Sequence, residues 1–176
     1  MDEIKSNWKY YQVSSIEQQQ KDWASSVKQI CIVKTVPELL YTLDQTEIAG
    51  LENFLDLSFF RQNIAPMWED PNNVTGGRII VEIPTALKEK LHGLWKKTVV
   101  FCILEPFKGI NGCVYAEKAN YRICIWISDP TSAEDITHAW KRILDCDELS
   151  FSFSLHAKHT EPSKSKKKPF SSRRDR

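Results

Sequence analysis

The stretch GCVYAEKANYRICIWIS, residues 112–128, holds two runs of β-branched and aromatic residues separated by a short polar turn. This pattern predicts an antiparallel hairpin with strands over 112–118 and 122–128. If residues 119–121 form the loop, Lys118 and Arg122 face each other across it. Trp126 lies four residues beyond Arg122 and points to the same face, because side chains alternate along a strand.

The segments on both sides of the hairpin add further strands and about three longer helices. Strands are predicted over residues 8–13, 27–33, 57–60, 78–83 and 149–155. Thr35 and Glu38 form a capping-box pattern that predicts a helix to about Leu43. Further helices are expected over 46–54, over 85–104, and through Ile136–Leu144 with Thr131 or Ser132 as the opening residue.

The predicted class is therefore α+β: a mostly antiparallel sheet with about three helices packed on one face. The other face is left for a ligand. Trp8, Trp95 and Trp140 lie on apolar faces of these elements and are expected in the core.

Length and composition favour one globular domain with a tail. The 176 residues are 41% hydrophobic and 27% charged, typical of a globular chain. Residues 158–176 contain eight Lys and Arg but two Asp and Glu, a net charge of +6, whereas residues 1–157 carry −5. We expect a single domain over 1–157 and a basic, disordered tail over 158–176.

Several function classes are disfavoured by the sequence. No apolar run is long enough to span a bilayer, and the acidic N-terminus lacks a signal-peptide segment. The five cysteines are scattered without a Cys-x-x-Cys pattern, which predicts no metal site, no disulfide framework and a cytosolic or nuclear location. An enzyme such as a nucleotide hydrolase is disfavoured because Gly76-Gly77-Arg78 lacks the spacing of a phosphate-cradling loop.

Two tryptophans stand apart from the expected core. Trp23 lies among polar residues, and Trp68 lies in the proline-rich and glycine-rich loop over 64–77. Indoles in loops can stack on nucleobases, although each could instead fold back onto the core. Glu69 follows Trp68, and a carboxylate there could accept both edge donors of guanine or remain a solvated loop acid.

Three cations accompany these indoles. Arg78 follows Gly76-Gly77, and Lys118 and Arg122 flank the hairpin turn. Such side chains could hold phosphates, although ordinary solvated charges are the alternative interpretation.

The segment Ile64-Ala65-Pro66-Met67-Trp68-Glu69-Asp70, followed by Gly76-Gly77-Arg78, resembles the signature of the mRNA 5′-cap-binding translation initiation factor 4E family. The order of other segments agrees: Trp8 with Tyr11, Ile123-Cys124-Ile125-Trp126, Ile136-Thr137-His138 and His156-Ala157. The resemblance covers about residues 7–160. It implies a curved antiparallel sheet with three helices on its convex face and the ligand slot on its concave face.

The resemblance implies a cap-binding protein that is not an enzyme and needs no cofactor. Trp23 and Trp68 would sandwich N7-methylguanine, Glu69 would accept its edge donors, and Trp126 would contact the N7 methyl group. A methylated, cationic base gains a cation–π attraction from the indoles. Arg78, Lys118 and Arg122 would lie along the phosphate bridge, with the Lys and Arg in the opposite order to the family's and the turn one residue shorter. The expected ligand is capped mRNA, bound by a monomer that is located in the cytoplasm or also in the nucleus.

The resemblance also implies a partner site on the helical side, for a Tyr-x-x-x-x-Leu-apolar helix of a scaffold factor or a repressor. Val36 matches the family there, but Leu40 replaces a Trp, and Lys96-Lys97 replaces Leu-Glu. We therefore expect a weakened or altered scaffold contact. This leaves open a second interpretation, a cap-binding translational regulator that does not assemble the usual scaffold complex.

Overall fold

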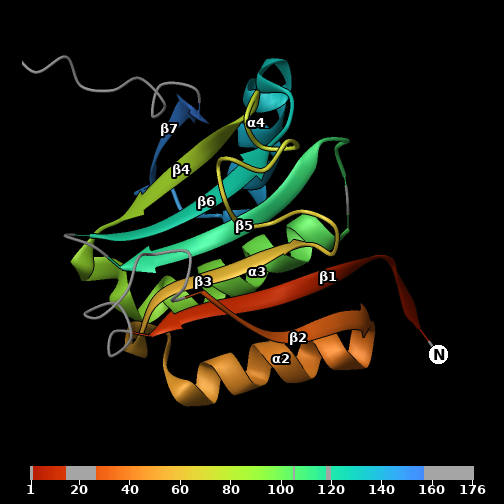
Figure 1. Ribbon diagram of the computed structural model, residues 1–176. Helices are drawn as coiled ribbons and strands as arrows, with labels where there is room; N and C mark the ends of the chain where they lie inside the picture. Colours follow the sequence, from red (N-terminus) through yellow and green to blue (C-terminus); the bar gives the residue numbers. More distant parts are fainter. Residues whose placement is uncertain (1, 15–26, 105, 118–119, 157–176) are drawn as a thin grey trace, which may run out of the picture.

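The computed structural model describes residues 2–14, 27–104, 106–117 and 120–156. Within them, seven strands form one antiparallel sheet in the order β2-β1-β3-β5-β6-β4-β7 (Figure 1). The strands are β1 Glu3–Ser14, β2 Lys28–Thr35, β3 Phe54–Arg61, β4 Gly77–Ile83, β5 Ile110–Glu117, β6 Tyr121–Ile127 and β7 Ser150–Leu155. The predicted antiparallel α+β class is confirmed.

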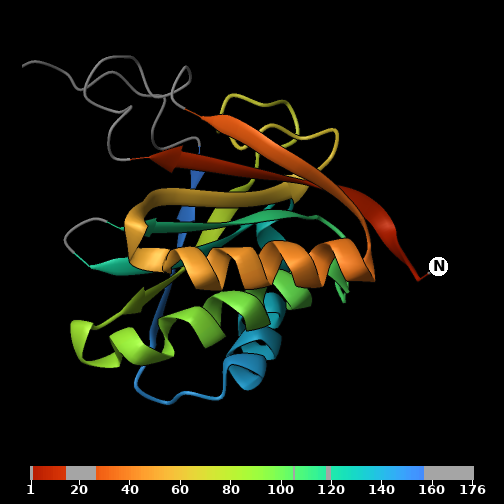
Figure 2. The ribbon, with the colours of Figure 1, turned by 90° about the horizontal axis from the view of Figure 1, so that it is seen from below.

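Three α-helices cover one face of the sheet. They are α2 Val36–Ala49, α3 Leu91–Ile103 and α4 Ala133–Leu144, with short 3₁₀ turns η1 Leu51–Asn53, η2 Thr85–Lys90 and η3 Pro130–Ser132. Figure 2 shows the three helices together below the sheet, while the loop between β3 and β4 lies above it. The two faces of the sheet are thereby given different environments.

The core lies between the helices and the sheet. Trp8, Trp95 and Trp140 are fully buried there, as their apolar patterning predicts. The indole Nε1 of Trp140 donates to the Thr98 hydroxyl oxygen over 3.0 Å, and that hydroxyl donates to the Leu94 carbonyl over 2.8 Å. These two bonds satisfy the polar atoms where α3 and α4 pack together.

The start of α2 matches the capping box, but its end differs from expectation. Glu38 accepts hydrogen bonds from the Lys34 and Thr35 amides over 2.7 and 3.0 Å. The separate helix predicted over 46–54 is wrong, because α2 continues to Ala49 and β3 starts at Phe54. Thr46 extends the buried side of α2, where its hydroxyl bonds the Tyr10 hydroxyl over 2.9 Å.

The other two helices each follow a short 3₁₀ turn. Residues 85–90 form such a turn before α3, and Leu87 within it has a non-helical backbone conformation. Ser132 is the N-cap residue of α4, as predicted, but its side chain makes no capping hydrogen bond. Asp129 caps the turn η3 before it: its carboxylate accepts from the Thr131 amide over 2.9 Å and the Thr131 hydroxyl over 2.7 Å.

The β5–β6 hairpin has a different register from the expected one. Its last pair is Glu117 with Tyr121, and Arg122 lies opposite Ala116. The prediction that Lys118 and Arg122 face each other is therefore wrong. Strand β6 begins at Tyr121, because an aromatic residue has a high strand propensity. The chain bends at Asn120, a residue type that is common in turns.

Replacing Thr98 with Val should destabilise the protein. The methyl group keeps the volume but leaves the buried Trp140 N–H without its acceptor, which costs about 1–3 kcal/mol of unfolding free energy. Thr85→Val, at an exposed position, is the matched control and should change stability by less than about 0.5 kcal/mol. Urea denaturation followed by circular dichroism measures both; equal stabilities of the two variants would contradict the packing described.

Candidate functional site

The sheet face without helices is organised as three rows of side chains that run across the strands. The antiparallel register defines each row. A charged row consists of Asp56, Ala116, Arg122 and Glu82. A middle row consists of Ser58, Val114, Cys124 and Ile80. An aromatic row consists of Phe60, Gly112, Trp126 and Arg78.

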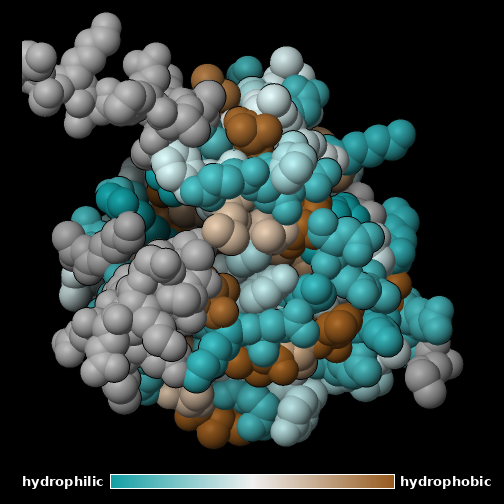
Figure 3. Space-filling view, viewed as in Figure 1, coloured by the Kyte–Doolittle hydropathy of each residue, from teal (hydrophilic) through white to brown (hydrophobic). Residues whose placement is uncertain are grey.

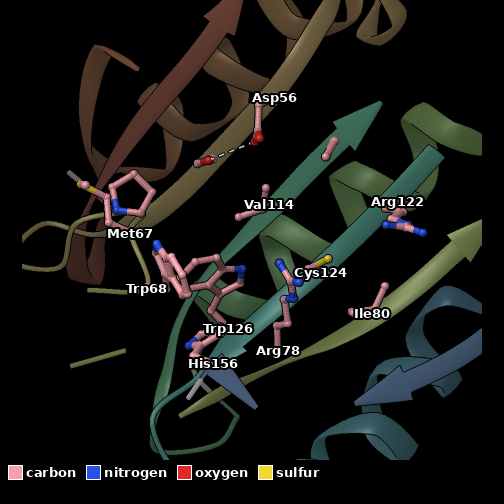
Figure 4. A pocket seen from close by; sticks show the side chains of 13 residues that line it. Asp56, Met67, Trp68, Arg78, Ile80, Val114, Arg122, Cys124, Trp126 and His156 are labelled. Atoms are coloured by element: carbon pink, nitrogen blue, oxygen red, sulfur yellow. Dashed lines mark hydrogen bonds between the residues drawn. The ribbon is translucent and has the colours of Figure 1, made fainter. Parts of the chain in front are cut away.

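A pocket of about 380 Å³ lies over these rows, within the size range of small-molecule sites. Its walls are completed by the β3–β4 loop, through Pro66, Met67 and Trp68, and by His156 (Figure 4). The charged and aromatic rows are four residues apart along each strand, roughly 13 Å by strand rise. Figure 3 shows that this side of the molecule is largely hydrophilic, with small separate hydrophobic groups. The pocket is thus elongated between a charged end and an aromatic end.

The aromatic end is built around Trp126. Its ring packs edge-on against Phe60, with centroids 5.4 Å apart, and it lies tilted against the His156 ring, with centroids 4.3 Å apart. Trp68 is half-buried and packs against the same small cluster, which also contains Ile64. The structure therefore brings the predicted residues Trp68 and Trp126 together in one pocket.

A buried amide network holds the loop that carries Trp68. The Asn73 side-chain NH₂ donates to the Ala65 and Met67 carbonyls over 2.9 and 2.8 Å. Asn111 of β5 donates to the Asn73 side-chain oxygen over 2.9 Å, and a ring nitrogen of His156 bonds the Asn73 carbonyl over 2.8 Å. Asn73 is fully buried. It therefore positions the backbone on both sides of Pro66, directly before Trp68.

Sequence reasoning did not single out Asn73 or Asn111. The available signal was a pair of asparagines, Asn72 and Asn73, in a long loop that otherwise contains Pro and Gly. Such residues are common in turns, so the pattern alone does not separate a buried structural amide from an exposed one.

Asp70 supports the same loop by accepting hydrogen bonds from the Ala65 amide over 2.9 Å and the Asn72 amide over 2.8 Å. Partial burial raises the pKa of the Asp70 carboxyl, but these bonds outweigh burial, and the net shift is downward. Asp70 is therefore an ionised acceptor that holds the loop closed around Trp68.

Gly76 and Gly77 allow the loop to enter the sheet. A Cβ at Gly76 would lie 1.9 Å from the Ile127 carbonyl oxygen, and one at Gly77 would lie 2.7 Å from the Ser154 carbonyl oxygen. Any larger residue would push β4 away from β6 or β7. These two glycines thus explain why Arg78, the next residue, can start opposite Trp126.

The charged end contains the predicted cation Arg122, together with an acid that was not predicted. Arg122 donates from Nε and Nη2 to one carboxylate oxygen of Glu82, over 3.0 and 2.7 Å. The two residues lie directly opposite each other on β6 and β4. Figure 4 shows Arg78 reaching from its place beside Trp126 toward Cys124. Arg78 and Arg122 therefore line one pocket at different distances from the indoles.

Three other residues were predicted for the pocket. Two of them, Trp23 and Lys118, lie outside the described residues. Glu69 is exposed on the loop and does not line the pocket. Trp68, Trp126, Arg78 and Arg122 are the predicted ligand residues that the pocket contains.

The predicted partner residues lie on the helical side, opposite the pocket. Val36 and Leu40 of α2 are exposed. Lys96 of α3 forms salt bridges with Glu47 and with Asp44, the latter over 3.3 Å. The hydrogen bond to Glu47 raises the pKa of Lys96.

Lys97 has a different internal partner. Its ammonium group donates to the Leu144 carbonyl at the end of α4 over 2.9 Å. A cation is favourable at a helix C-terminus, where carbonyls lack intrahelical partners. Lys96 and Lys97 therefore connect α3 to both neighbouring helices, and both lysines have partners within the chain.

Two further properties concern only the part of the chain that the structure describes. It contains no cluster of three or more His, Cys, Asp or Glu side chains able to hold a metal ion. None of its helices is both long enough and apolar enough for a membrane crossing.

Comparisons with known proteins give consistent matches. A family model described as eukaryotic initiation factor 4E matches residues 3–170. The chain is 28% identical to eukaryotic translation initiation factor isoform 4E of Capsicum annuum over 82% of this chain and 74% of that protein. A crystal structure of Ascaris suum eIF4E-3 with m2,2,7G cap has a TM-score of 0.78 at 24% identity, covering 88% of this chain and 91% of that chain. The structure of C. elegans eIF4E-3 in complex with the 4E-binding protein Mextli has a TM-score of 0.79 at 21% identity. That match covers 92% of this chain and 97% of that chain.

Replacing Asn73 with Asp should loosen the loop. The change turns an NH₂ donor that faces two carbonyls into an oxygen that repels them, at a cost of about 2–3 kcal/mol. Asn53→Asp is the matched control, because Asn53 is exposed and donates to a single carbonyl on the helical side. Hydrogen exchange should accelerate over residues 64–76 in the first variant alone. Unchanged exchange there would show that Asn73 does not position Trp68.

Proposed function

The chain belongs to the eukaryotic initiation factor 4E family, as its signature motif predicts, and we propose that it binds the N7-methylguanosine 5′ cap of mRNA for translation initiation. The observation that carries this proposal is the pocket with Trp68 and Trp126 at one end and Arg122 at the other. The Ascaris relative was crystallised with a cap. The order of groups in the pocket here suits the parts of a cap, with aromatic side chains for the base and cations for the phosphates.

The base would bind at the aromatic end. Trp68 stacks on one face of N7-methylguanine, and Trp23 closes over the other. Methylation at N7 makes the ring cationic, so both indoles add a cation–π attraction to stacking. Trp126 is buried against Phe60 and His156, and it offers the N7 methyl group a rigid apolar contact.

Guanine recognition is assigned to Glu69. Its carboxylate accepts the N1–H and N2–H₂ donors, a pair that no other common base presents. Glu69 directly follows Trp68, whose loop is held by Asn73 and Asp70.

The phosphates would extend toward the charged row. Arg78 lies beside Trp126 and is therefore closest to the first phosphate, while Arg122 lies four residues farther along β6. Lys118, before the hairpin turn, is the third proposed cation. The ligand is capped mRNA, and binding requires no cofactor and no chemical turnover.

The helical side is the proposed site for a protein partner that carries a Tyr-x-x-x-x-Leu-apolar helix. Val36 and Leu40 provide exposed apolar contacts there. Lys96 and Lys97 replace an apolar residue and an acid of the family pattern, and they are bonded within the chain. These observations support a weakened scaffold contact, so the second candidate function is a cap-binding regulator or repressor.

The proposal also includes a single cap-binding domain over 1–157, a basic tail over 158–176, a monomeric state and a cytoplasmic location. Complementation separates the two candidate functions. Rescue of a strain that lacks its initiation factor supports the initiation role, whereas cap binding without rescue supports the regulator.

Tryptophan fluorescence should be quenched strongly by N7-methyl-GTP and weakly by GTP. By calorimetry, Trp68→Ala should weaken binding of the methylated nucleotide about 10- to 100-fold, because base–aromatic stacking contributes about 1–3 kcal/mol. Tyr41→Ala, which removes an exposed ring on the helical side, is the control and should leave affinity unchanged. Equal affinity of the wild type for both nucleotides would contradict methyl-cap recognition.

A Tyr-x-x-x-x-Leu-apolar peptide should bind the wild type weakly in a calorimetric titration. The double variant Lys96→Leu, Lys97→Glu restores the family residues and should raise affinity at least about fivefold, because it returns an apolar residue and an acid to the groove. The double variant Lys141→Glu, Arg142→Gln, at exposed positions on α4, makes the same change in net charge and is the control. Strong binding by the wild type, or no gain in the double variant, would contradict the altered groove.

A further inference from the structure

The charged row contains an acid that phosphate binding does not call for. The Glu82 carboxylate lies directly opposite Arg122, and one of its oxygens accepts both the Nε and the Nη2 hydrogen of that guanidinium. Arg122 is thus engaged along one edge before a ligand arrives. A phosphate has to bind the outer edge or displace the carboxylate.

Either route carries an electrostatic cost. A guanidinium has five N–H donors, so the outer edge of Arg122 can still donate to a phosphate. An anion bound there lies close to the Glu82 carboxylate, and like charges at that distance repel even when water screens them partly. Displacing the carboxylate instead removes two charge-assisted hydrogen bonds.

A second carboxylate stands in the same row. Asp56 lies opposite Ala116, and Ala116 lies opposite Arg122. The backbone of Asp56 is therefore two strands, or roughly 10 Å, from the backbone of Arg122. Among the described residues, the charged row therefore holds two acids and one base. Arg78 lies in the aromatic row, four residues before Glu82 along β4.

We infer that Glu82 is a specificity-determining residue that limits how much the phosphate chain adds to cap affinity. The inference rests on the proposed cap-binding function. In this account, the methylated base and the phosphate nearest Arg78 supply most of the affinity, and phosphates that reach Arg122 add little. The protein accordingly distinguishes the methylation state of a cap strongly and the length of its phosphate chain weakly.

The competing interpretation is an incidental surface ion pair. Arg122 and Glu82 side chains are 40% and 42% exposed, and exposed pairs often contribute little. In that case a phosphate would take Arg122 from Glu82 at negligible cost. Removing the Glu82 charge would then have no more effect than removing any distant acid.

The test compares N7-methylguanosine with its mono-, di- and triphosphate by calorimetry at constant ionic strength, for the wild type and for Glu82→Gln. The wild-type affinity ratio of triphosphate to monophosphate should be below about 10, and Glu82→Gln should raise it about 5- to 20-fold, equivalent to about 1–1.8 kcal/mol. The affinity of Glu82→Gln for N7-methylguanosine, which carries no phosphate, should equal that of the wild type. Glu134→Gln, at the exposed start of α4, is the control and should change the ratio less than about twofold.

A double-mutant cycle locates the effect. In an Arg122→Gln background, Glu82→Gln should act no more strongly than the control, because the pair no longer exists. An unchanged or smaller ratio in Glu82→Gln, with normal nucleoside binding, would overturn the inference alone. Failure of the wild type to bind the methylated nucleoside and all three nucleotides would overturn the proposed function, and the inference with it.

Discussion

The β4–β6 register is the constraint on which the rest of the structure depends. Ile79, Val81, Ile123 and Ile125 are fully buried against the helices, so these strands pair in a way that keeps all four on one face. A slip of one residue would turn them to the open face. The same register therefore fixes the alternate positions: Trp126 beside Arg78 and Arg122 beside Glu82. Core burial thereby determines the chemical order of the pocket.

The pocket loop and the helical face are stabilised in different ways. The loop that carries Trp68 depends on the buried amide of Asn73, whose directional bonds to Ala65 and Met67 set its position. The helical face is joined by Lys96 and Lys97, which reach α2 and α4. Lysines that connect helices inside the molecule also change the charge presented to a partner. If the proposed partner binds this face, substitutions at these two positions will change both stability and partner affinity.

Much of this arrangement could be predicted from sequence where the determinants are local. The capping box at Thr35 and Glu38, the buried Trp95 and the loop with Trp68 all follow from short-range patterns. Contacts between distant residues could not be predicted: Glu82 and Arg122 are 40 residues apart, and Asn73 meets His156 over 83 residues. The hairpin register was missed because Tyr121 favours the strand over the loop. The roles of Trp23 and Lys118 rest on the family motif, since both lie outside the described residues.

We propose that one sheet face presents a base site and a phosphate site in a fixed order. A crystal structure with N7-methyl-GDP would show that order. The methylated base should stack on Trp68 with its methyl group toward Trp126, and the phosphates should run past Arg78 toward Arg122. A nucleotide bound in the reverse direction, with phosphates against Trp126, or bound on the helical side, would contradict it.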